Sequence, residues 1–160
     1  MSTPPGPGGP APRLHHVAVQ TADLANSLAW YRDFLGCRPT WSVDTFSDLT
    51  RERLPGVTRI AELALGEVRI HLLGCPGTPP ARPGVEINHY QHLGFAVATP
   101  EHLRWWRERW LELFASASYR FARPEPPTRI VTDPDGGQSF YCHDVNGLEL
   151  EFTYLPGGAR

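Results

Sequence analysis

The sequence contains the same structural pattern twice. Starting at Leu14, "LHHVAVQTADLANSLAWYRDFLG" combines an alternating strand, a Thr/Asp turn and an amphipathic helix that is expected to end at Gly36. The segment "YQHLGFAVATPEHLRWWRERWLELF" repeats this order, with Pro100 at the expected first position of the second helix. About three further strands follow each helix. Two copies of this unit predict an α+β domain built from paired βαβββ modules.

The same patterns set the expected boundaries. Residues 1–13 form a Pro/Gly-rich tail, module one covers 14–73, a Pro/Gly-rich linker covers 74–88, module two covers 89–155, and 156–160 form a second tail. Together the two modules make one domain of residues 14–155. The alternative is a generic α+β domain whose halves are alike by chance.

Further strands are expected after each helix. In module one they lie at 39–44, 57–65 and 67–73, with a polar loop at 45–56. In module two they lie at 118–122, 128–132, 138–144 and 148–154.

Composition excludes several classes of function. The formal net charge is −2 and no basic block is present, which argues against nucleic acid as a partner. The three cysteines, Cys37, Cys75 and Cys142, form no CxxC pair and favour a reducing cytoplasm over secretion. The first residues lack the features of a signal peptide, and no apolar run is long enough for a membrane span. We therefore expect a cytoplasmic protein with no membrane partner.

Polar side chains recur at matching strand positions of the two modules. Alternate residues of a strand face opposite ways, so the apolar positions of each strand point to the core and the positions between them point away from it. His16 and His71 lie on this second face in module one, and His92, Glu149 and Glu151 lie on it in module two. If the sheet curves into a cup, these side chains converge inside it.

Two histidines and a carboxylate are a common ligand set for a divalent first-row metal, and the open positions that remain suit non-haem Fe(II). Taken singly, a histidine or glutamate on a strand is more often only facing solvent. The remaining histidines, His15, His89, His102 and His143, are interpreted as such surface or edge residues.

The strand-turn-helix segments and "HDVNGLELEF" resemble the vicinal oxygen chelate superfamily, which includes glyoxalase I, fosfomycin-resistance and bleomycin-resistance proteins, and extradiol dioxygenases. The resemblance covers nearly all of residues 14–155. It implies a cup-shaped mixed sheet, made by the paired modules, around one metal site. It also implies that His16, His92 and Glu151 are the metal ligands, with Glu149 as the second choice for the carboxylate.

Within the superfamily, "FYCHDVNGLELE" is similar to an extradiol dioxygenase pattern that places a tyrosine ten residues before the ligand glutamate. Here Tyr141 precedes Glu151 at that spacing, although Val145 replaces the usual proline. The closest likeness is to small dioxygenases with one module pair, of the L-DOPA 2,3-dioxygenase type, in secondary-metabolite (antibiotic) biosynthesis. The resemblance implies Fe(II), a small aromatic catechol and O2, with His71 as acid/base and Tyr141 as a hydrogen-bond donor.

Two alternatives stay open. One is a glyoxalase-, epimerase- or thiol-transferase-type enzyme in which His71 is a fourth ligand to Mn, Ni or Zn. The other is a metal-free protein that sequesters a drug in the same cup. We expect a homodimer, although the sequence does not say whether modules pair within a chain or across chains. Residues that could contact a substrate are the aromatic Trp41, Phe46 and Tyr154 and the basic Arg51, Arg53, Arg69 and Arg129.

Overall fold

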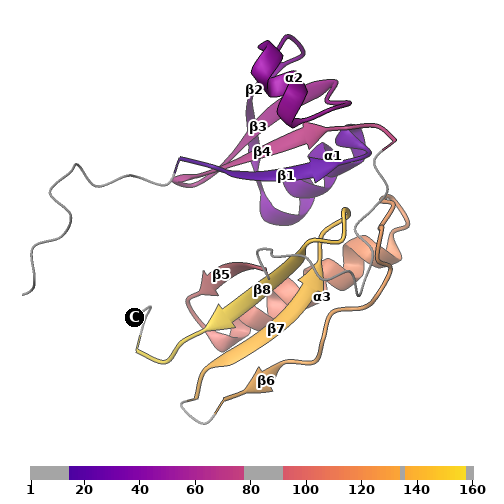
Figure 1. Cartoon of the computed structure of the whole chain (residues 1–160). Coiled ribbons are helices and arrows are strands. Elements are labelled where there is room, and N and C mark those ends of the chain that lie inside the picture. The colour runs from indigo at the N-terminus through magenta and orange to yellow at the C-terminus, as the bar shows by residue number, and fades with distance from the viewer. Residues whose placement is uncertain (1–14, 78–91, 134–135, 158–160) are drawn as a thin grey trace, which may run out of the picture.

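The fold was obtained as a computed structural model, which describes residues 15–77, 92–133 and 136–157 (Figure 1). The predicted tail at 1–13, most of the predicted linker at 74–88 and the last three residues lie outside the described residues.

Each module contains one long helix and four strands. Module one has β1 (Val17–Thr21), α1 (Leu24–Leu35), β2 (Arg38–Val43), the short α2 (Asp48–Arg53), β3 (Arg59–Leu65) and β4 (Val68–Gly74). Module two has β5 (Leu93–Val97), α3 (Pro100–Ala115), β6 (Val131–Thr132), β7 (Gln138–His143) and β8 (Glu149–Tyr154).

The strands form two four-stranded mixed sheets with equivalent topology. The order is β1-β4-β3-β2 in the first sheet, here called sheet A, and β5-β8-β7-β6 in the second, called sheet B. In each sheet the first strand of the module pairs in parallel with the last strand, and the other neighbours are antiparallel. The predicted fold class, α+β with paired βαβββ modules, is confirmed.

Helix α1 begins and ends where the sequence predicts. The Asp23 side chain accepts the Asn26 backbone N–H at 3.0 Å and so caps the first turn. Gly36 closes the helix with φ +70°, a left-handed conformation that glycine adopts without a steric penalty. In α3, Thr99 provides the equivalent cap and Pro100 starts the helix.

Two predicted segments differ from the structure. The polar stretch 45–56, predicted as a loop, contains α2, because Ser47 accepts the Thr50 backbone N–H and caps a single short helix. Residues 118–122, predicted as a strand, belong to no strand. Their backbone bonds instead to the side chain of Asn26 on α1, which accepts the Arg120 N–H and donates to the Arg120 carbonyl. Similarly, only Val131–Thr132 of 128–132 joins the sheet.

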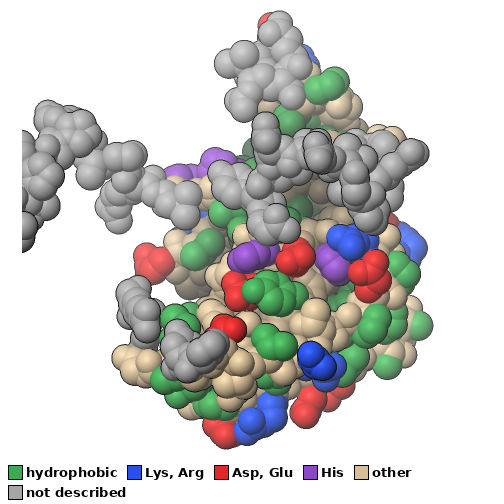
Figure 2. All heavy atoms as spheres, turned by 60° about the horizontal axis from the view of Figure 1, so that its bottom comes forward, with side chains coloured by type: hydrophobic (Ala, Val, Ile, Leu, Met, Phe, Trp, Pro, Cys, Tyr) green, Lys and Arg blue, Asp and Glu red, His purple; other side chains and the backbone are tan. Residues whose placement is uncertain are grey.

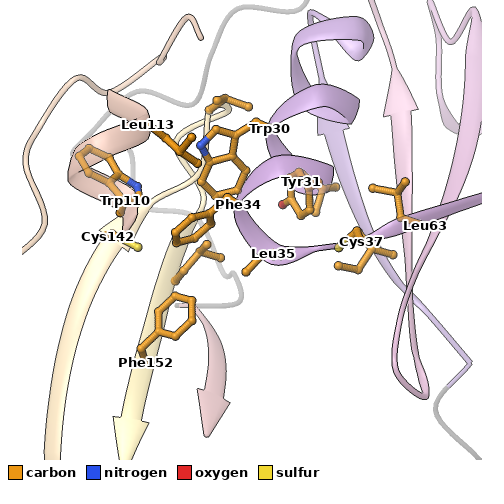
Figure 3. Packing of buried hydrophobic residues seen from close by; sticks show 14 of the residues in the cluster. Trp30, Tyr31, Phe34, Leu35, Cys37, Leu63, Trp110, Leu113, Cys142 and Phe152 are labelled. Atoms are coloured by element: carbon orange, nitrogen blue, oxygen red, sulfur yellow. The ribbon is translucent and has the colours of Figure 1, made fainter. Parts of the chain in front are cut away.

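Helix α1 joins the two modules. Figure 3 shows it between Leu63 of sheet A on one side and Trp110, Leu113 and Phe152 of module two on the other. The Phe34 ring lies 5.8 Å from Phe152, measured between ring centroids. Because α1 covers one face of sheet A and also contacts module two, the other face of sheet A points away from module two.

A buried polar contact fixes the same junction. The Tyr31 hydroxyl donates to the Asp144 carboxylate at 2.9 Å, and both side chains are fully buried. Asp144 also accepts the backbone N–H groups of Asn146 and Leu148 and thereby shapes the "DVNG" turn between β7 and β8. Burial raises the pKa of the Asp144 carboxyl. The junction between the modules therefore contains a directional hydrogen bond as well as apolar packing.

Candidate metal centre

In module one, His16 and His71 lie together on the face of sheet A that points away from α1, here called its open face. The open face of sheet B is the one that carries Glu151. On β4 the buried Ile70 and Leu72 alternate with His71, so the apolar pair faces α1 and the histidine faces away from it. The His16 and His71 rings are stacked, with centroids 3.8 Å apart. Burial lowers the pKa of His16, and the neighbouring imidazoles of His71 and His15 lower it further.

A carboxylate that the sequence analysis did not identify holds His71. Glu62 on β3 lies directly opposite His71 in the antiparallel pair, and its Oε2 is 3.0 Å from His71 Nε2. Glu62 is only 7% exposed and accepts the Thr40 hydroxyl at 2.6 Å. The Thr40 hydrogen bond and the contact with His71 keep the pKa of Glu62 below its usual value.

Glu62 could have been assigned to the open face, because it alternates with the core residues Ala61 and Leu63. Alternation does not predict the pairing register of β3 and β4, which places Glu62 beside His71.

His15, interpreted as an ordinary surface or edge histidine, is exposed and lies beside this group. Both His15 and His16 precede β1, and Nδ1 of His15 lies 3.0 Å from Nδ1 of His16. The ring centroid of His15 is 6.2 Å from that of His71. In the described part of the chain, these three histidines are the group of potential metal ligands whose donor atoms all lie within 4.8 Å of one another.

In module two, the predicted ligands His92 and Glu151 are neighbours. Nε2 of His92 lies 3.0 Å from Oε2 of Glu151, and the Tyr141 hydroxyl donates to the other carboxylate oxygen at 3.0 Å. Tyr141 and Glu151 are opposite each other on β7 and β8. Burial raises the pKa of Tyr141, and the adjacent carboxylate raises it further. Gly94, opposite Glu151 on β5, puts no side chain against the carboxylate.

Glu151, not Glu149, receives the contacts of His92 and Tyr141, which favours the first of the two predicted carboxylates. Glu149 lies opposite His143 in the sheet.

The two halves of the predicted ligand set are on different sheets. His92 and Glu151 lie outside the three-histidine group that contains His16, within the residues that the structure describes. Figure 2 shows histidine side chains at separate places on the visible face, some beside acidic side chains. A single chain therefore brings His16 to His71, and His92 to Glu151 and Tyr141, but does not bring one pair to the other.

Of the predicted substrate contacts, Trp41 and Arg69 lie near His71. The Trp41 ring, 40% exposed, is 5.0 Å from the His71 ring, and Arg69 Nε is 3.9 Å from Oε1 of Glu62. Tyr154 instead packs against the hydrophobic core. An apolar pocket of about 230 Å³, lined by Leu35, Phe95 and other residues of the module junction, carries no titratable side chain. The predicted site residues therefore lie outside this pocket.

Residues 13–152 match the family described as the glyoxalase/bleomycin resistance protein/dioxygenase superfamily, and the chain belongs to this family. No curated protein matches the sequence. None of the described helices is long and apolar enough to cross a membrane.

Solved structures share the fold at low sequence identity. A glyoxylase/bleomycin resistance protein/dioxygenase domain from Frankia sp. EAN1pec is 21% identical, with a TM-score of 0.66 over 91% of this chain and 98% of that one. Lactoylglutathione lyase from Agrobacterium tumefaciens is 19% identical, with a TM-score of 0.57 over 91% and 96%. The fosfomycin resistance protein FosX from Listeria monocytogenes, in complex with Mn(II) and sulfate, is 14% identical, with a TM-score of 0.57 over 89% and 91%.

Proposed function

We propose that this protein is a metal-dependent enzyme whose site is completed by two copies of the chain. His16 and His71 on the open face of sheet A would meet His92 and Glu151 on the open face of sheet B from the second copy. The support is the position of α1, which turns the open face of sheet A away from module two of its own chain. A closed dimer with two-fold symmetry would build two such sites.

The residues fit a divalent cation. Two donors at about 2.1 Å from one ion and at right angles to each other lie about 3.0 Å apart. The distance from His92 Nε2 to Glu151 Oε2 has this value. The fosfomycin resistance protein of the same fold was solved with Mn(II). Imidazole and carboxylate ligands accept Fe, Mn, Ni and Zn, so the donor set does not select one of them.

Among the reactions of this family, we infer extradiol cleavage of a catechol, such as L-DOPA, with Fe(II). The observation that carries this inference is the hydrogen bond from Tyr141 to Glu151, which joins the two ends of the dioxygenase-like "FYCHDVNGLELE" segment at the candidate ligand. When bound, Fe(II) would supply redox chemistry and adjacent open positions for the two substrates. Both oxygen atoms of O2 enter the ring-opened product, so no external reductant is needed. A secondary-metabolite pathway is part of this proposal.

The chain's own residues have separate roles in this reaction. His71, oriented by Glu62 at 3.0 Å, would take a proton from the catechol hydroxyl and return it later. The Tyr141 hydroxyl donates its one proton to the Glu151 carboxylate, and it would donate to an oxygen of the substrate instead once Glu151 binds the ion. The exposed Trp41 ring beside His71 offers a flat apolar surface to an aromatic substrate. We place the reaction in the reducing cytoplasm, which agrees with three free, buried cysteines.

The test is anaerobic reconstitution with Fe(II), addition of L-DOPA and simpler catechols, and admission of air. The expected result is uptake of one O2 per catechol with a yellow muconic-semialdehyde-type product, lost in Glu151→Ala. If metal binds but no catechol is turned over, the dioxygenase proposal is wrong.

A second candidate is a glyoxalase- or thiol-transferase-type enzyme. The observation that favours it is that His71 lies beside the predicted ligand His16 on the same face of sheet A, where a fourth ligand from module one would have to be. Turnover of a hemithioacetal or an epoxide with Ni(II), Mn(II) or Zn(II), and none of a catechol, would identify this class.

A further inference from the structure

We propose that Trp41 and Arg69 form a substrate-recognition surface beside His71, and that this surface selects an aromatic compound whose side group carries a carboxylate. Trp41 would contact the ring, and Arg69 would bind the carboxylate. This inference rests on the proposed function, which assigns the catechol end of the substrate. It adds the chemical class of the other end and names the residue that selects it.

A bulge in β2 directs Trp41 toward His71. The register of β2 on β3 shifts between Pro39 and Trp41, which makes Thr40 an extra residue in the strand. The Thr40 hydroxyl bonds to Glu62 at 2.6 Å, and the Trp41 ring lies 5.0 Å from the His71 ring. Two successive residues of β2 thus reach the same Glu62–His71 pair, which regular alternation would not allow. Bulges often re-aim a side chain in this way next to an active site.

The Trp41 ring is available to a ligand. It is 40% exposed, although an aromatic side chain of this size gains more from burial than almost any other. Val43, two residues further along β2, is 42% exposed and extends the apolar surface on the same side of the strand. An exposed aromatic ring beside an acid/base histidine offers a contact surface for a planar substrate.

The Arg69 guanidinium is held in place and keeps donors for a ligand. Its Nη1 donates to the backbone carbonyls of Gly66 at 3.0 Å and Val68 at 3.3 Å, which fix it at the turn between β3 and β4. Its Nε is 3.9 Å from Oε1 of Glu62, beyond hydrogen-bond distance. The residue opposite Arg69 on β3 is the small Ala64, which leaves space above the sheet. A planar guanidinium fixed in this way suits a carboxylate, which accepts two parallel N–H groups.

The spacing of Arg69 and His71 fits one small molecule. The two residues lie on the same face of β4, two positions and so about 7 Å apart. A catechol whose hydroxyl meets His71 would bring a side group of two or three carbons toward Arg69. Glu62 does not compete for Arg69, because its oxygens already bond Thr40 and contact His71. A side group without a carboxylate gains nothing from Arg69, so the surface favours an acid.

The experiment compares four catechols that differ only in the side group: L-DOPA and 3,4-dihydroxyphenylpropionate, which carry a carboxylate, and dopamine and 4-ethylcatechol, which do not. Calorimetry measures their binding to the full-length protein loaded with Zn²⁺, which has no redox chemistry and leaves the catechol intact. In the wild type, both acids should bind about 10- to 100-fold more tightly than 4-ethylcatechol. Arg69→Met keeps an unbranched side chain and should remove this preference while leaving the affinity for 4-ethylcatechol unchanged. Arg69→Lys, which keeps the charge but not the planar fork, should retain part of it.

Arg59→Met is the matched control. Arg59 lies on β3 of the same sheet and is paired with Asp44 at 3.1 Å, so its loss should leave the preference for the acids unchanged. Trp41→Leu should weaken the binding of all four catechols by a similar factor of about 2 to 10.

The proposal is overturned if the acids bind the wild type no better than 4-ethylcatechol, or if Arg69→Met keeps their preference. It is also overturned if Trp41→Leu abolishes the dimer in gel filtration and leaves catechol affinity unchanged, because Trp41 would then be a contact between copies. Turnover is not measured here. The dioxygenase reaction can therefore fail while the preference for the acids, and its loss in Arg69→Met, is still observed.

Discussion

At the scale of single residues, Glu62 is the side chain that decides how His71 can act. It is buried, accepts the Thr40 hydroxyl and lies 3.0 Å from His71 Nε2. We expect Glu62→Gln to lower kcat by about 10- to 100-fold, because the neutral amide orients the His71 ring less firmly than the carboxylate does. The KM for the catechol should stay close to its wild-type value, a split between kcat and KM that a merely structural role would not produce.

Glu67→Gln is the matched control for this variant. Glu67 is an exposed glutamate in the turn between β3 and β4, five residues from Glu62 on the same hairpin. It should leave both kcat and KM unchanged. A wild-type kcat for Glu62→Gln would contradict the role assigned to Glu62.

Tyr141→Phe tests the hydroxyl beside Glu151. The substitution keeps the ring and removes a donor that bonds the carboxylate at 3.0 Å, so we expect lower kcat and a stability loss of about 0.5–1.5 kcal/mol. Stopped-flow kinetics and urea unfolding measure the two effects. Tyr154→Phe is the control, because Tyr154 packs against the core on the other face of sheet B. A Tyr141→Phe enzyme with wild-type kcat would exclude a role in turnover.

Sequence reasoning identified the candidate site residues through strand alternation, and it missed Glu62 and the contact of His15 with His16. His71 and Glu151 were assigned to the open face because apolar neighbours flank them on β4 and β8. Glu62 acts on His71 across a strand pair, and the register of that pair follows from the folded sheet. Alternation assigns His15 and His16 to opposite faces, but both residues precede β1, and their rings are in contact.

At the scale of elements, the N-terminus of α1 depends on Asp23. The bond from the Asn26 N–H, and then the contact with Arg120, keep the pKa of Asp23 below its ordinary value of 3.8. A carboxyl with a lowered pKa in the folded state stabilises the fold above its ordinary pKa, and this stabilisation is lost as the pH falls through the lowered value. Asp23→Ala should therefore cost about 1 kcal/mol at neutral pH.

Asp23→Asn separates the cap from the charge. Asparagine is a comparable N-cap, so stability at neutral pH should stay within a few tenths of a kcal/mol of the wild type. Urea unfolding from about pH 6 to about pH 2.5 should show a shallower loss of stability for Asp23→Asn, because the lowered pKa no longer contributes. An identical pH dependence in the two proteins would contradict the assignment.

The sequence predicted best the helices whose ends carry capping residues. Helix α1 has its cap at Asp23 and its stop at Gly36, and α3 has Thr99 and Pro100 at its start. Residues 118–122 alternate like a strand, but the backbone of Arg120 bonds to the side chain of Asn26, 94 residues away in the sequence. A partner that distant leaves no local signal, so the segment was predicted as a strand.

At the scale of the whole molecule, α1 has two buried faces. Leu63 lies on the side of sheet A, and Phe152 lies on the side of module two. The period of the helix predicted one apolar stripe, but the second contact surface is set by how the modules pack and was not predictable from the pattern. Because of that packing, the predicted ligands His16 on sheet A and His92 and Glu151 on sheet B lie apart within one chain.

Mixing two inactive variants tests whether the site crosses chains. If His16 of one copy works with Glu151 of the other, a His16→Ala chain and a Glu151→Ala chain form a hybrid with one doubly damaged site and one intact site. Random exchange makes half of the dimers hybrids, so activity should recover to about a quarter of the wild-type value. Each variant alone should stay inactive. A mixture assayed before its subunits have exchanged should recover no activity. No recovery after complete exchange would mean that all the ligands come from one chain. The modules would then have to repack around α1, and Phe34 would have to leave Phe152.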